Sequence, residues 1–303
     1  MPVYNGGRYV AESIESILNQ SFRDFELVIS DNASDDETGD ICKRYQSADP
    51  RIRYHRNDRN IGAAPNFNRT VEQSRGDYFT WAAHDDVYAD TYLERTVAVL
   101  DGRPDVVLVY TGVRLIGEQG RDLKPEPDGD GHIDSAGSRI MALDVNHLAE
   151  GVNASDRFHD ALHGINWCLQ VFGVIRTDVL RRTHLQRSYY GADKVLLAEL
   201  ALQGRFQQVE TLLFAKRVHA DMSFYKSVKE KREWIDPNAT HWLPQVQMLR
   251  DYTIAVVRSD LSGREKARCF RHIAKMFRRP GLLRRIFVPG PENYLGLNFS
   301  RSN

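Results

Sequence analysis

Helix-like and strand-like segments alternate along the first 116 residues of the chain. Apolar residues recur at helical spacing in four stretches, which predicts helices over 9–20, 36–47, 65–74 and 91–101. Ser34 or Asp35 is expected to cap the second of these helices. Short apolar and β-branched runs between them predict strands over 25–30, 51–57, 77–83 and 106–116. Such alternation is typical of a mostly parallel central sheet flanked by helices on both faces, so the sequence predicts an α/β fold.

The rest of the chain is expected to complete this fold and then to become helical. Glycine, proline and charged residues dominate 117–137, which predicts a long mobile loop between two halves. An amphipathic helix is expected over 194–202, followed by returning strands between Phe206 and Phe214. The expected organisation is a first half over 1–116, a second half of the same domain over 117–225, and a helical C-terminal extension over 226–303.

Composition excludes several classes of protein. The formal net charge of the 303 residues is +0, which argues against a general nucleic-acid binder. The cysteines at 42, 168 and 269 are far apart, so neither a disulfide framework nor a zinc site is expected. No run of about 18 apolar residues and no leader pattern is found, so we expect a cytoplasmic chain.

The chain opens in "MPVYNGG", a loop-like segment without an apolar strand before it. The first strand of an α/β fold usually lies near the middle of the sheet. Either residues upstream are missing or the first strand is very short.

Polar loops follow three of the expected strands. They are Tyr4 to Gly7, Asp31 to Asp36, and His84-Asp85-Asp86. Ligands of open α/β sheets bind at the carboxyl ends of the strands, so we expect these loops to share one cleft. Adjacent carboxylates repel each other, and a fold that holds both supplies a cation or hydrogen-bond donors. Solvated turn residues are the alternative explanation for Asp85 and Asp86.

Two segments carry a family resemblance. They read "PVYNGGRYVAESIESILNQSFRDFELVISDNASDDET" and "NIGAAPNFNRTVEQSRGDYFTWAAHDD". Together they resemble the nucleotide-sugar-binding half of family 2 glycosyltransferases, which have the GT-A fold; the likeness continues more weakly to about residue 225. It implies an inverting transferase that moves a sugar from a nucleoside-diphosphate sugar to a hydroxyl of a glycan or lipid-linked acceptor, as in cell-surface polysaccharide or glycolipid synthesis.

The resemblance also implies residues that bind the donor. The opening segment would line the nucleotide base, with Tyr4 packed on it. An acidic residue after the second strand would contact base or ribose, and a later loop would pass near the sugar nucleotide. The matching positions are Pro2, Val3, Tyr4, Asp31, Asn32, Asn60 and Gly62.

A divalent cation, Mn²⁺ or Mg²⁺, is implied as well. His84, Asp85 and Asp86 occupy the place of the family's Asp-x-Asp metal motif, with a histidine at its first position. Asp86 is expected to hold the cation on the diphosphate, with help from Asp85, while His84 would lie beside the donor. "KRVHADMS" resembles a segment that closes over the pyrophosphate, and it nominates His219 as a second ligand, beside Arg217.

The catalytic base is expected at Asp193. Inverting members use a carboxylate of the second half to deprotonate the acceptor, and "GADK" resembles that site. The alternative is that Asp193 is the N-cap of the helix at 194–202.

Further interpretations remain open. A nucleotidyltransferase would also use acidic metal ligands, but "NGGRY" is only a faint phosphate loop. A noncatalytic carbohydrate-binding protein would need neither Asp86 nor Asp193.

The segment 264–285 is strongly basic, with Glu265 as its sole acidic residue, so it is either a membrane-surface helix at the inner face or a solvated face. Four aromatic residues could stack on a sugar or fill the core: Trp167, Phe172, Tyr189 and Tyr190.

Overall fold

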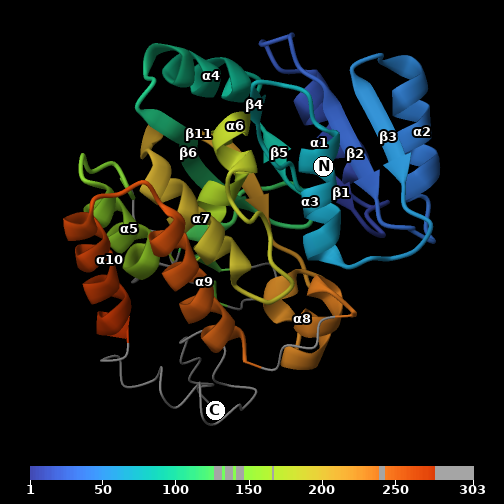
Figure 1. The fold of residues 1–303 in the computed structure, drawn as a ribbon. Coiled ribbons are helices and arrows are strands. Elements are labelled where there is room, and N and C mark those ends of the chain that lie inside the picture. Colours follow the sequence, from blue (N-terminus) through green and yellow to red (C-terminus); the bar gives the residue numbers. More distant parts are fainter. Residues whose placement is uncertain (126–131, 134–138, 141–146, 166, 239–242, 277–303) are drawn as a thin grey trace.

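The structure is a computed structural model that describes residues 1–125, 132–133, 139–140, 147–165, 167–238 and 243–276. Its N-terminal part contains a three-stranded sheet in which both strand pairs are parallel. The strands are β1 (Pro2–Val3), β2 (Leu27–Asp31) and β3 (Ile52–Arg56), and the helices are α1 (Val10–Leu18), α2 (Thr38–Ala48) and α3 (Ala63–Gln73). Figure 1 shows this unit on the right, where the C-terminal ends of β2 and β3 point the same way.

A five-stranded sheet joins the two predicted halves, in the order β4-β10-β6-β11-β5. The long central strands β6 and β11 run parallel, whereas β10 and β5 run antiparallel to their neighbours. The strands are β4 (Tyr78–Phe79), β5 (Val87–Tyr88), β6 (Val106–Ile116), β10 (Val174–Arg176) and β11 (Arg205–Arg217). The predicted α/β fold is confirmed, and its parallel pairing lies in β1 to β3 and between β6 and β11.

Helix α7 (Ala192–Gln203) lies at the centre of the largest apolar core. Every residue from Val195 to Leu202 is buried, as expected of a helix that other elements cover on all sides. Around the sheet and α7 lie α4 (Tyr92–Gly102), α5 (Ala154–Gly164), α6 (Thr177–Arg181), α8 (Val228–Ile235), α9 (Pro244–Arg258) and α10 (Gly263–Met276). Two short 3₁₀ helices span Leu169–Phe172 and Ser223–Tyr225.

Several elements differ from the sequence-based expectations. The strand expected over 77–83 is reduced to β4, and the strands expected from Phe206 onward form one strand, β11, whose register with β6 shifts near Val209. Neither Ser34 nor Asp35 caps α2, because the helix starts after Glu37 without a side-chain cap. The loop expected over 117–137 contributes to a small antiparallel sheet of β7 (Lys124–Pro125), β8 (His132–Ile133) and β9 (Arg139–Ile140).

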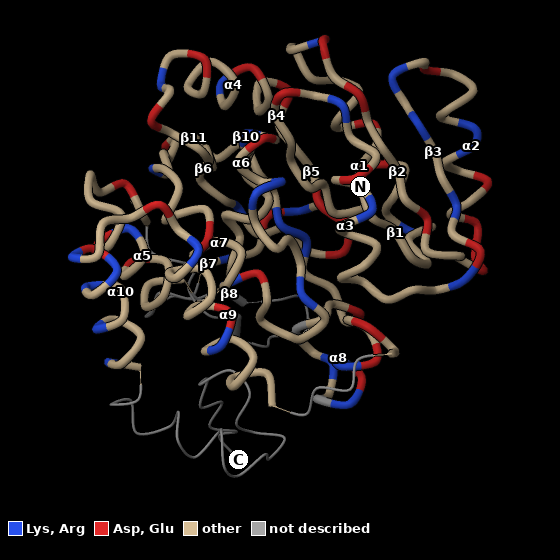
Figure 2. Tube along the Cα trace, in the orientation of Figure 1, with Lys and Arg blue, Asp and Glu red and all other residues tan. Residues whose placement is uncertain are grey.

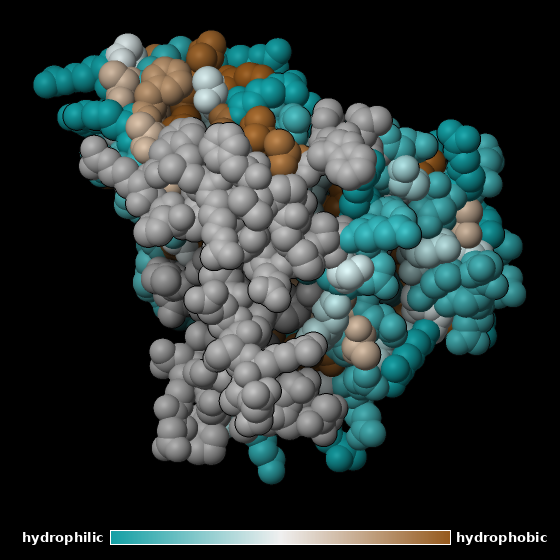
Figure 3. All heavy atoms as spheres, turned by 90° about the horizontal axis from the view of Figure 1, so that it is seen from below, coloured by the Kyte–Doolittle hydropathy of each residue, from teal (hydrophilic) through white to brown (hydrophobic). Residues whose placement is uncertain are grey.

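The surface is mainly polar. Lysine, arginine and acidic residues alternate along the trace in Figure 2, and the end-on view in Figure 3 shows a mostly hydrophilic surface on the right. None of the helices in the described part of the chain combines the length and apolar character that a membrane span needs. The division of the chain at residues 116 and 225 stays a prediction, and residues 277–285 of the basic segment lie outside the described residues.

Candidate functional site

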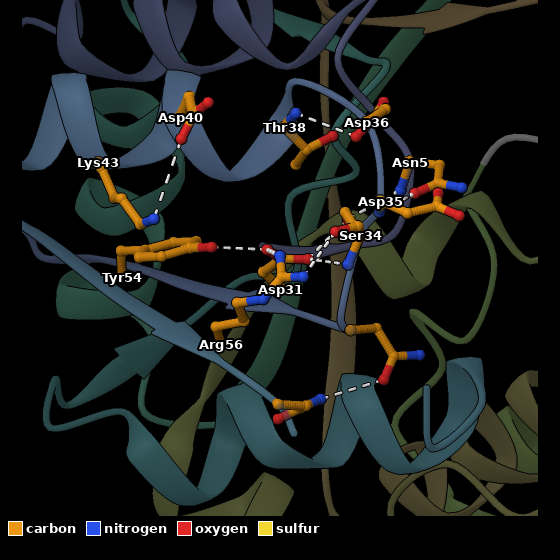
Figure 4. Close-up of polar contacts among 12 residues, drawn as sticks. Asn5, Asp31, Ser34, Asp35, Asp36, Thr38, Asp40, Lys43, Tyr54 and Arg56 are labelled. Carbon is orange, nitrogen blue, oxygen red and sulfur yellow. Dashed lines mark hydrogen bonds and ion pairs between the residues drawn. The ribbon is translucent and has the colours of Figure 1, made fainter. Parts of the chain in front are cut away.

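Asp31 ends β2 and is completely buried. Its Oδ1 accepts hydrogen bonds from the backbone N and the hydroxyl of Ser34, at 2.9 and 2.6 Å. Its Oδ2 accepts from the Tyr54 hydroxyl at 2.6 Å and from Arg56 Nη1 at 2.8 Å, as Figure 4 shows. The carboxylate thus fixes the loop after β2 to the neighbouring strand; direct contact between Asp31 and a nucleotide stays a prediction.

The loop after β1 is tied to the loop after β2. Asn5 N donates to Ser34 Oγ at 2.9 Å, and Gly6 N donates to Thr38 Oγ1 at 2.8 Å. In return, the backbone N of Asp35 donates to Asn5 Oδ1 at 3.0 Å. Figure 4 shows Asn5 facing Ser34 and Asp35. Two of the three predicted polar loops therefore form one rigid surface.

The third loop lies against the first. A Cβ added to Gly6 would lie 2.5 Å from His84 Cδ2, so the imidazole packs directly on the glycine backbone. Burial lowers the pKa of His84, although the Asp85 carboxylate acts in the opposite direction. The three loops thus lie together as predicted, and His84 has a packing contact that only a glycine at position 6 allows; that the loops form one ligand cleft stays a prediction.

The predicted donor-binding residues differ in exposure. Pro2 and Val3 form β1 and are buried, whereas Tyr4 is 41% exposed at the edge of the loop. Tyr4 is therefore accessible to a ligand, and its packing on a nucleotide base stays a prediction.

Asn32 holds the loop that contains Asn60 and Gly62. Its Nδ2 donates to Asn60 Oδ1 at 2.8 Å, and its Oδ1 accepts from Ile61 N at 2.9 Å. Asn60 Oδ1 also accepts from Gly62 N at 2.9 Å. Asn32 is 2% exposed, so its amide shapes this loop from inside the protein, and contact of the loop with a donor stays a prediction.

The adjacent carboxylates have different partners. Asp86 is fully buried, and its oxygens accept from the Arg217 backbone N at 2.9 Å and from Lys216 Nζ at 3.1 Å. Asp85 Oδ2 instead lies 2.9 Å from Nε2 of His219. Asp86 therefore fastens the turn to β11, and Asp85 meets the other predicted ligand, His219; which of the two aspartates holds a metal stays a prediction.

The pKa values of the two carboxyl groups diverge accordingly. Burial raises the pKa of Asp86 to about 6, with the Asp85 charge adding to the rise and Lys216 opposing it. Burial would also raise the pKa of Asp85, but Lys216 and the contact with His219 outweigh it and hold that pKa below its usual range. Asp85 is therefore ionised at neutral pH.

Arg217 organises the site, whereas the sequence named it only as the residue beside the predicted ligand His219. It is 1% exposed and donates from Nε to the Asp85 carbonyl oxygen at 2.8 Å and from Nη2 to Glu12 at 2.6 Å. Nη1 donates to the carbonyl oxygen of Gly117 at 3.2 Å, and the guanidinium lies 4.7 Å from the centroid of the Tyr9 ring. One side chain thus joins α1, the aspartate turn and the segment after β6. The sequence signal for it was the "KRVHADMS" segment.

The Asp85 and His219 pair is a candidate cation site. The two side chains are 11% and 7% exposed, and His219 Nδ1 is buried without a hydrogen-bond partner among the described residues. A carboxylate oxygen and an imidazole nitrogen suit Mn²⁺, whereas Mg²⁺ prefers oxygen ligands alone. Within the described ranges no cluster of three or more metal-binding side chains occurs, so two protein ligands would leave positions for a diphosphate and water. The pair fits such a cation.

Asp193 lies in the first turn of α7. The helix N-cap is Gly191, with φ +90°, so the alternative interpretation of Asp193 as the N-cap is wrong. Its Oδ1 accepts from the backbone N of Lys194 at 3.0 Å, and Cys168 also hydrogen-bonds to the carboxyl group. Burial raises the pKa of Asp193, which makes the carboxylate a stronger base than an exposed one.

A short packing path connects Asp193 with His219. Trp167, the neighbour of Cys168, packs in a small apolar cluster with Val218 and Met222, on either side of His219. Of the other predicted stacking residues, Tyr189 is buried in the main core and Phe172 packs between two core clusters, so both serve packing.

Comparison with known proteins places the N-terminal part of the chain. Residues 1–138 match glycosyl transferase family 2. An uncharacterized glycosyltransferase of Methanocaldococcus jannaschii, MJ1057, is 34% identical over 131 residues, or 42% of this chain and 45% of that protein. The chain thus spans less than half the length of this relative.

Solved structures share the fold over most of the chain. TarS 1–349 of S. aureus, in complex with UDP, aligns with a TM-score of 0.59 at 17% identity, over 92% of this chain and 69% of that one. The mannosyltransferase PcManGT from Pyrobaculum calidifontis, in complex with GDP-Man and Mn²⁺, aligns with a TM-score of 0.57 at 15% identity, over 94% and 71%. The predicted GT-A fold is confirmed.

Proposed function

We propose that the chain moves a sugar from a nucleoside-diphosphate sugar to a hydroxyl of a glycan or lipid-linked acceptor, since residues 1–138 match glycosyl transferase family 2. The observation that carries the proposal is the meeting of Asp85 with His219 beside the three loops that end β1, β2 and β4. The nucleotide and Mn²⁺ bound in the structures of TarS and PcManGT support the same donor class.

We assign separate roles in metal binding to the residues around Asp85. Asp85 and His219 would hold a divalent cation, which supplies charge stabilisation for the departing diphosphate. Asp86, Lys216 and Arg217 would keep Asp85 in place. This proposal moves the principal metal contact from Asp86 to Asp85, because both oxygens of Asp86 already accept from protein donors.

Asp193 would act as the general base. It would remove the proton of the acceptor hydroxyl as that oxygen attacks the sugar carbon from the face opposite the leaving diphosphate. A single displacement of this kind inverts the anomeric configuration. The raised pKa of Asp193 suits this proton transfer, and the path through Cys168 and Trp167 links the base to the His219 segment.

The proposed lipid-linked acceptor is argued from the positive charge of helix α10. Helix α10 buries Cys269 and Ile273 against the protein and carries its basic residues on the outside. A basic outer face would hold the enzyme at an anionic membrane surface, where a lipid-linked acceptor is found. Cell-surface polysaccharide or glycolipid synthesis at the cytoplasmic face is the setting we propose.

Calorimetric titration of the chain with UDP, GDP, dTDP and CDP tests the donor part. Each nucleotide is titrated with Mn²⁺, with Mg²⁺ and with EDTA. We expect one nucleotide to bind only with metal, and more tightly with Mn²⁺ than with Mg²⁺. Absence of binding to every nucleotide would contradict the proposed function, and binding that EDTA leaves unchanged would contradict the metal site.

A further inference from the structure

A cavity of about 330 Å³ lies between helix α3, the loop before α7 and helix α9. Asn68 of α3, Arg187 and Tyr189 of the loop, and Arg250 and Asp251 of α9 are among the residues that line it. Figure 1 shows α9 beside α7, the helix into which this loop leads. None of the lining residues belongs to the three polar loops or to the proposed cation pair, so the proposed function leaves this cavity without a role.

Hydrogen bonds hold the walls of the cavity in place. Asn68 Nδ2 donates to the Gln186 carbonyl oxygen, and Asn68 Oδ1 accepts from Gln186 N, both at 2.9 Å. The Tyr189 hydroxyl donates to Asp251 Oδ2 at 2.8 Å. These bonds fix the loop to α3 on one side and to α9 on the other, so the cavity is formed before any ligand arrives, as is usual for binding sites.

Two buried polar atoms of the lining residues have no hydrogen bond within the described part of the chain. One is a donor, Nε of Arg187, and the other is an acceptor, Oδ1 of Asp251. Arg187 Nε lies 3.6 Å from Asp251 Oδ2, and Arg250 Nε lies 3.8 Å from Asp251 Oδ1, so these ion pairs are too long to be hydrogen bonds. Asp251 is 2% exposed, and an unsatisfied polar atom at such depth costs free energy unless a water or a ligand completes its bonding.

The cavity also carries an excess of positive charge. Two guanidinium groups and one carboxylate line it. His184, another lining residue, adds no charge, because its Nε2 accepts from Arg258 Nη1 at 2.6 Å and so carries no proton. Glu199 contacts the other ring nitrogen of His184 and balances the charge of Arg258. Water would satisfy the two open atoms without neutralising the remaining charge, so the cavity suits an anionic ligand.

We infer that this cavity binds a phosphorylated sugar or polyol. The phosphate accepts hydrogen bonds from the guanidinium groups of Arg187 and Arg250, whose paired N–H donors match phosphate oxygens. A hydroxyl of the same ligand donates to Asp251 Oδ1. One ligand thus supplies both the acceptor that Arg187 Nε lacks and the donor that Asp251 Oδ1 lacks. The inference does not depend on the proposed function, since it involves neither the nucleotide nor the cation.

Calorimetry in the presence of EDTA tests this binding without a contribution from the cation site. The probes are the 1-phosphates of glucose, galactose, mannose and N-acetylglucosamine, together with inorganic phosphate and the four free sugars. At least one sugar phosphate should bind the native chain, and more tightly than inorganic phosphate or its free sugar does. Arg187→Met should weaken that binding about tenfold or more, the typical loss of one charge-assisted hydrogen bond. Arg187→Lys should retain part of the affinity, because it keeps the charge but not the paired donors.

Two further variants complete the test. Arg250 is 58% exposed, so Arg250→Met should fold normally and still weaken binding of the sugar phosphate. The matched control is Arg182→Met, which removes an exposed arginine that lies 3.2 Å from Asp178. Its affinity should stay within about twofold of that of the native chain.

Three results would overturn the inference. The first is a native chain that binds none of the sugar phosphates, and the second is native affinity in both Arg187→Met and Arg250→Met. The third is equal affinity for inorganic phosphate and for the best sugar phosphate, which would leave Asp251 Oδ1 without a ligand hydroxyl. Nucleotide binding with Mn²⁺ is measured separately and should be unchanged in both variants. Its absence from the native chain would contradict the proposed function while sugar phosphate binding still supported this inference.

Discussion

Nε2 of His219 lies 2.9 Å from Oδ2 of Asp85, although 134 positions separate the two residues in the chain. The contact joins the turn after β4 to the end of β11, and Arg217 and Lys216 hold both sides of it. The proposed metal-binding part of the site therefore depends on how β11 docks.

Substitutions of Asp85 and of Asp86 should have different effects. Asp85→Ala should abolish metal-dependent nucleotide binding while the protein stays folded. Asp86→Ala should lower the free energy of unfolding by about 3 kcal/mol, because it leaves buried Lys216 without its carboxylate partner. Calorimetry with Mn²⁺ and urea denaturation measure the two effects. A stable Asp86→Ala protein that no longer binds metal would restore Asp86 as the main ligand.

Replacement of Arg217 should destabilise the protein. Arg217→Met removes a buried guanidinium and strands its carbonyl partners, at a cost of about 3–5 kcal/mol in the free energy of unfolding. The matched control is Arg8→Met, since Arg8 forms an exposed pair with Glu118 and its loss should change stability little. Urea denaturation of both variants checks the prediction, and similar midpoints would contradict it.

Asp193→Asn should retain nucleotide binding and lose transfer. The base works only when ionised, and burial raises its pKa, so transfer should fall with decreasing pH above the range of an ordinary aspartate. The pH profile of turnover with saturating donor measures this decrease in transfer. A profile flat down to the usual aspartate range, or full activity of the asparagine variant, would exclude Asp193 as the base.

Stability should depend on pH through His272. Its ring centroid lies 4.7 Å from that of His159 on α5, and burial, with the His159 and Lys275 charges, lowers the pKa of His272. Below about 6.5, the unfolded chain takes up a proton that the folded chain resists. The free energy of unfolding should therefore fall as pH drops below this value. Urea denaturation at pH 7.5 and 5.5 should show a smaller difference for His272→Gln than for the native chain; an equal difference would contradict the assignment.

The basic face of α10 should bind anionic membranes. The full chain should sediment with vesicles that contain an anionic lipid at low salt, and be released at high salt because the attraction is screened. Arg268→Glu combined with Arg271→Glu should reduce sedimentation. Vesicles of neutral lipid provide the control, and equal retention on both kinds would contradict the charge argument.

The sequence predicted the elements with strong local periodicity. β6 has the predicted bounds, 106–116, and α1 lies inside the predicted 9–20, because a continuous apolar run and a clear helical stripe override other influences. The convergence of the polar loops followed from a general property of α/β sheets. These features depend on short stretches of chain and on the topology they imply.

The contacts that the sequence did not predict join distant segments of the chain. Whether Asp85 or Asp86 faces the site depends on β11, some 130 positions later, and periodicity in a turn carries no such information. The same holds for Arg217, whose partners come from three separate elements, and for Ser34, whose Oγ accepts from Asn5 N instead of capping α2. Side chains to which local sequence patterns assign one role instead form hydrogen bonds with residues from distant segments.

The wide chain separation across the Asp86 contacts has a consequence for biosynthesis. A nascent polypeptide that has emerged only through residue 138 contains both aspartates but lacks Lys216, Arg217 and His219. Burying the turn at that stage would leave two like charges uncompensated. The aspartate turn should therefore remain hydrated on the ribosome until β11 arrives, and closure of that long loop becomes a late step in folding.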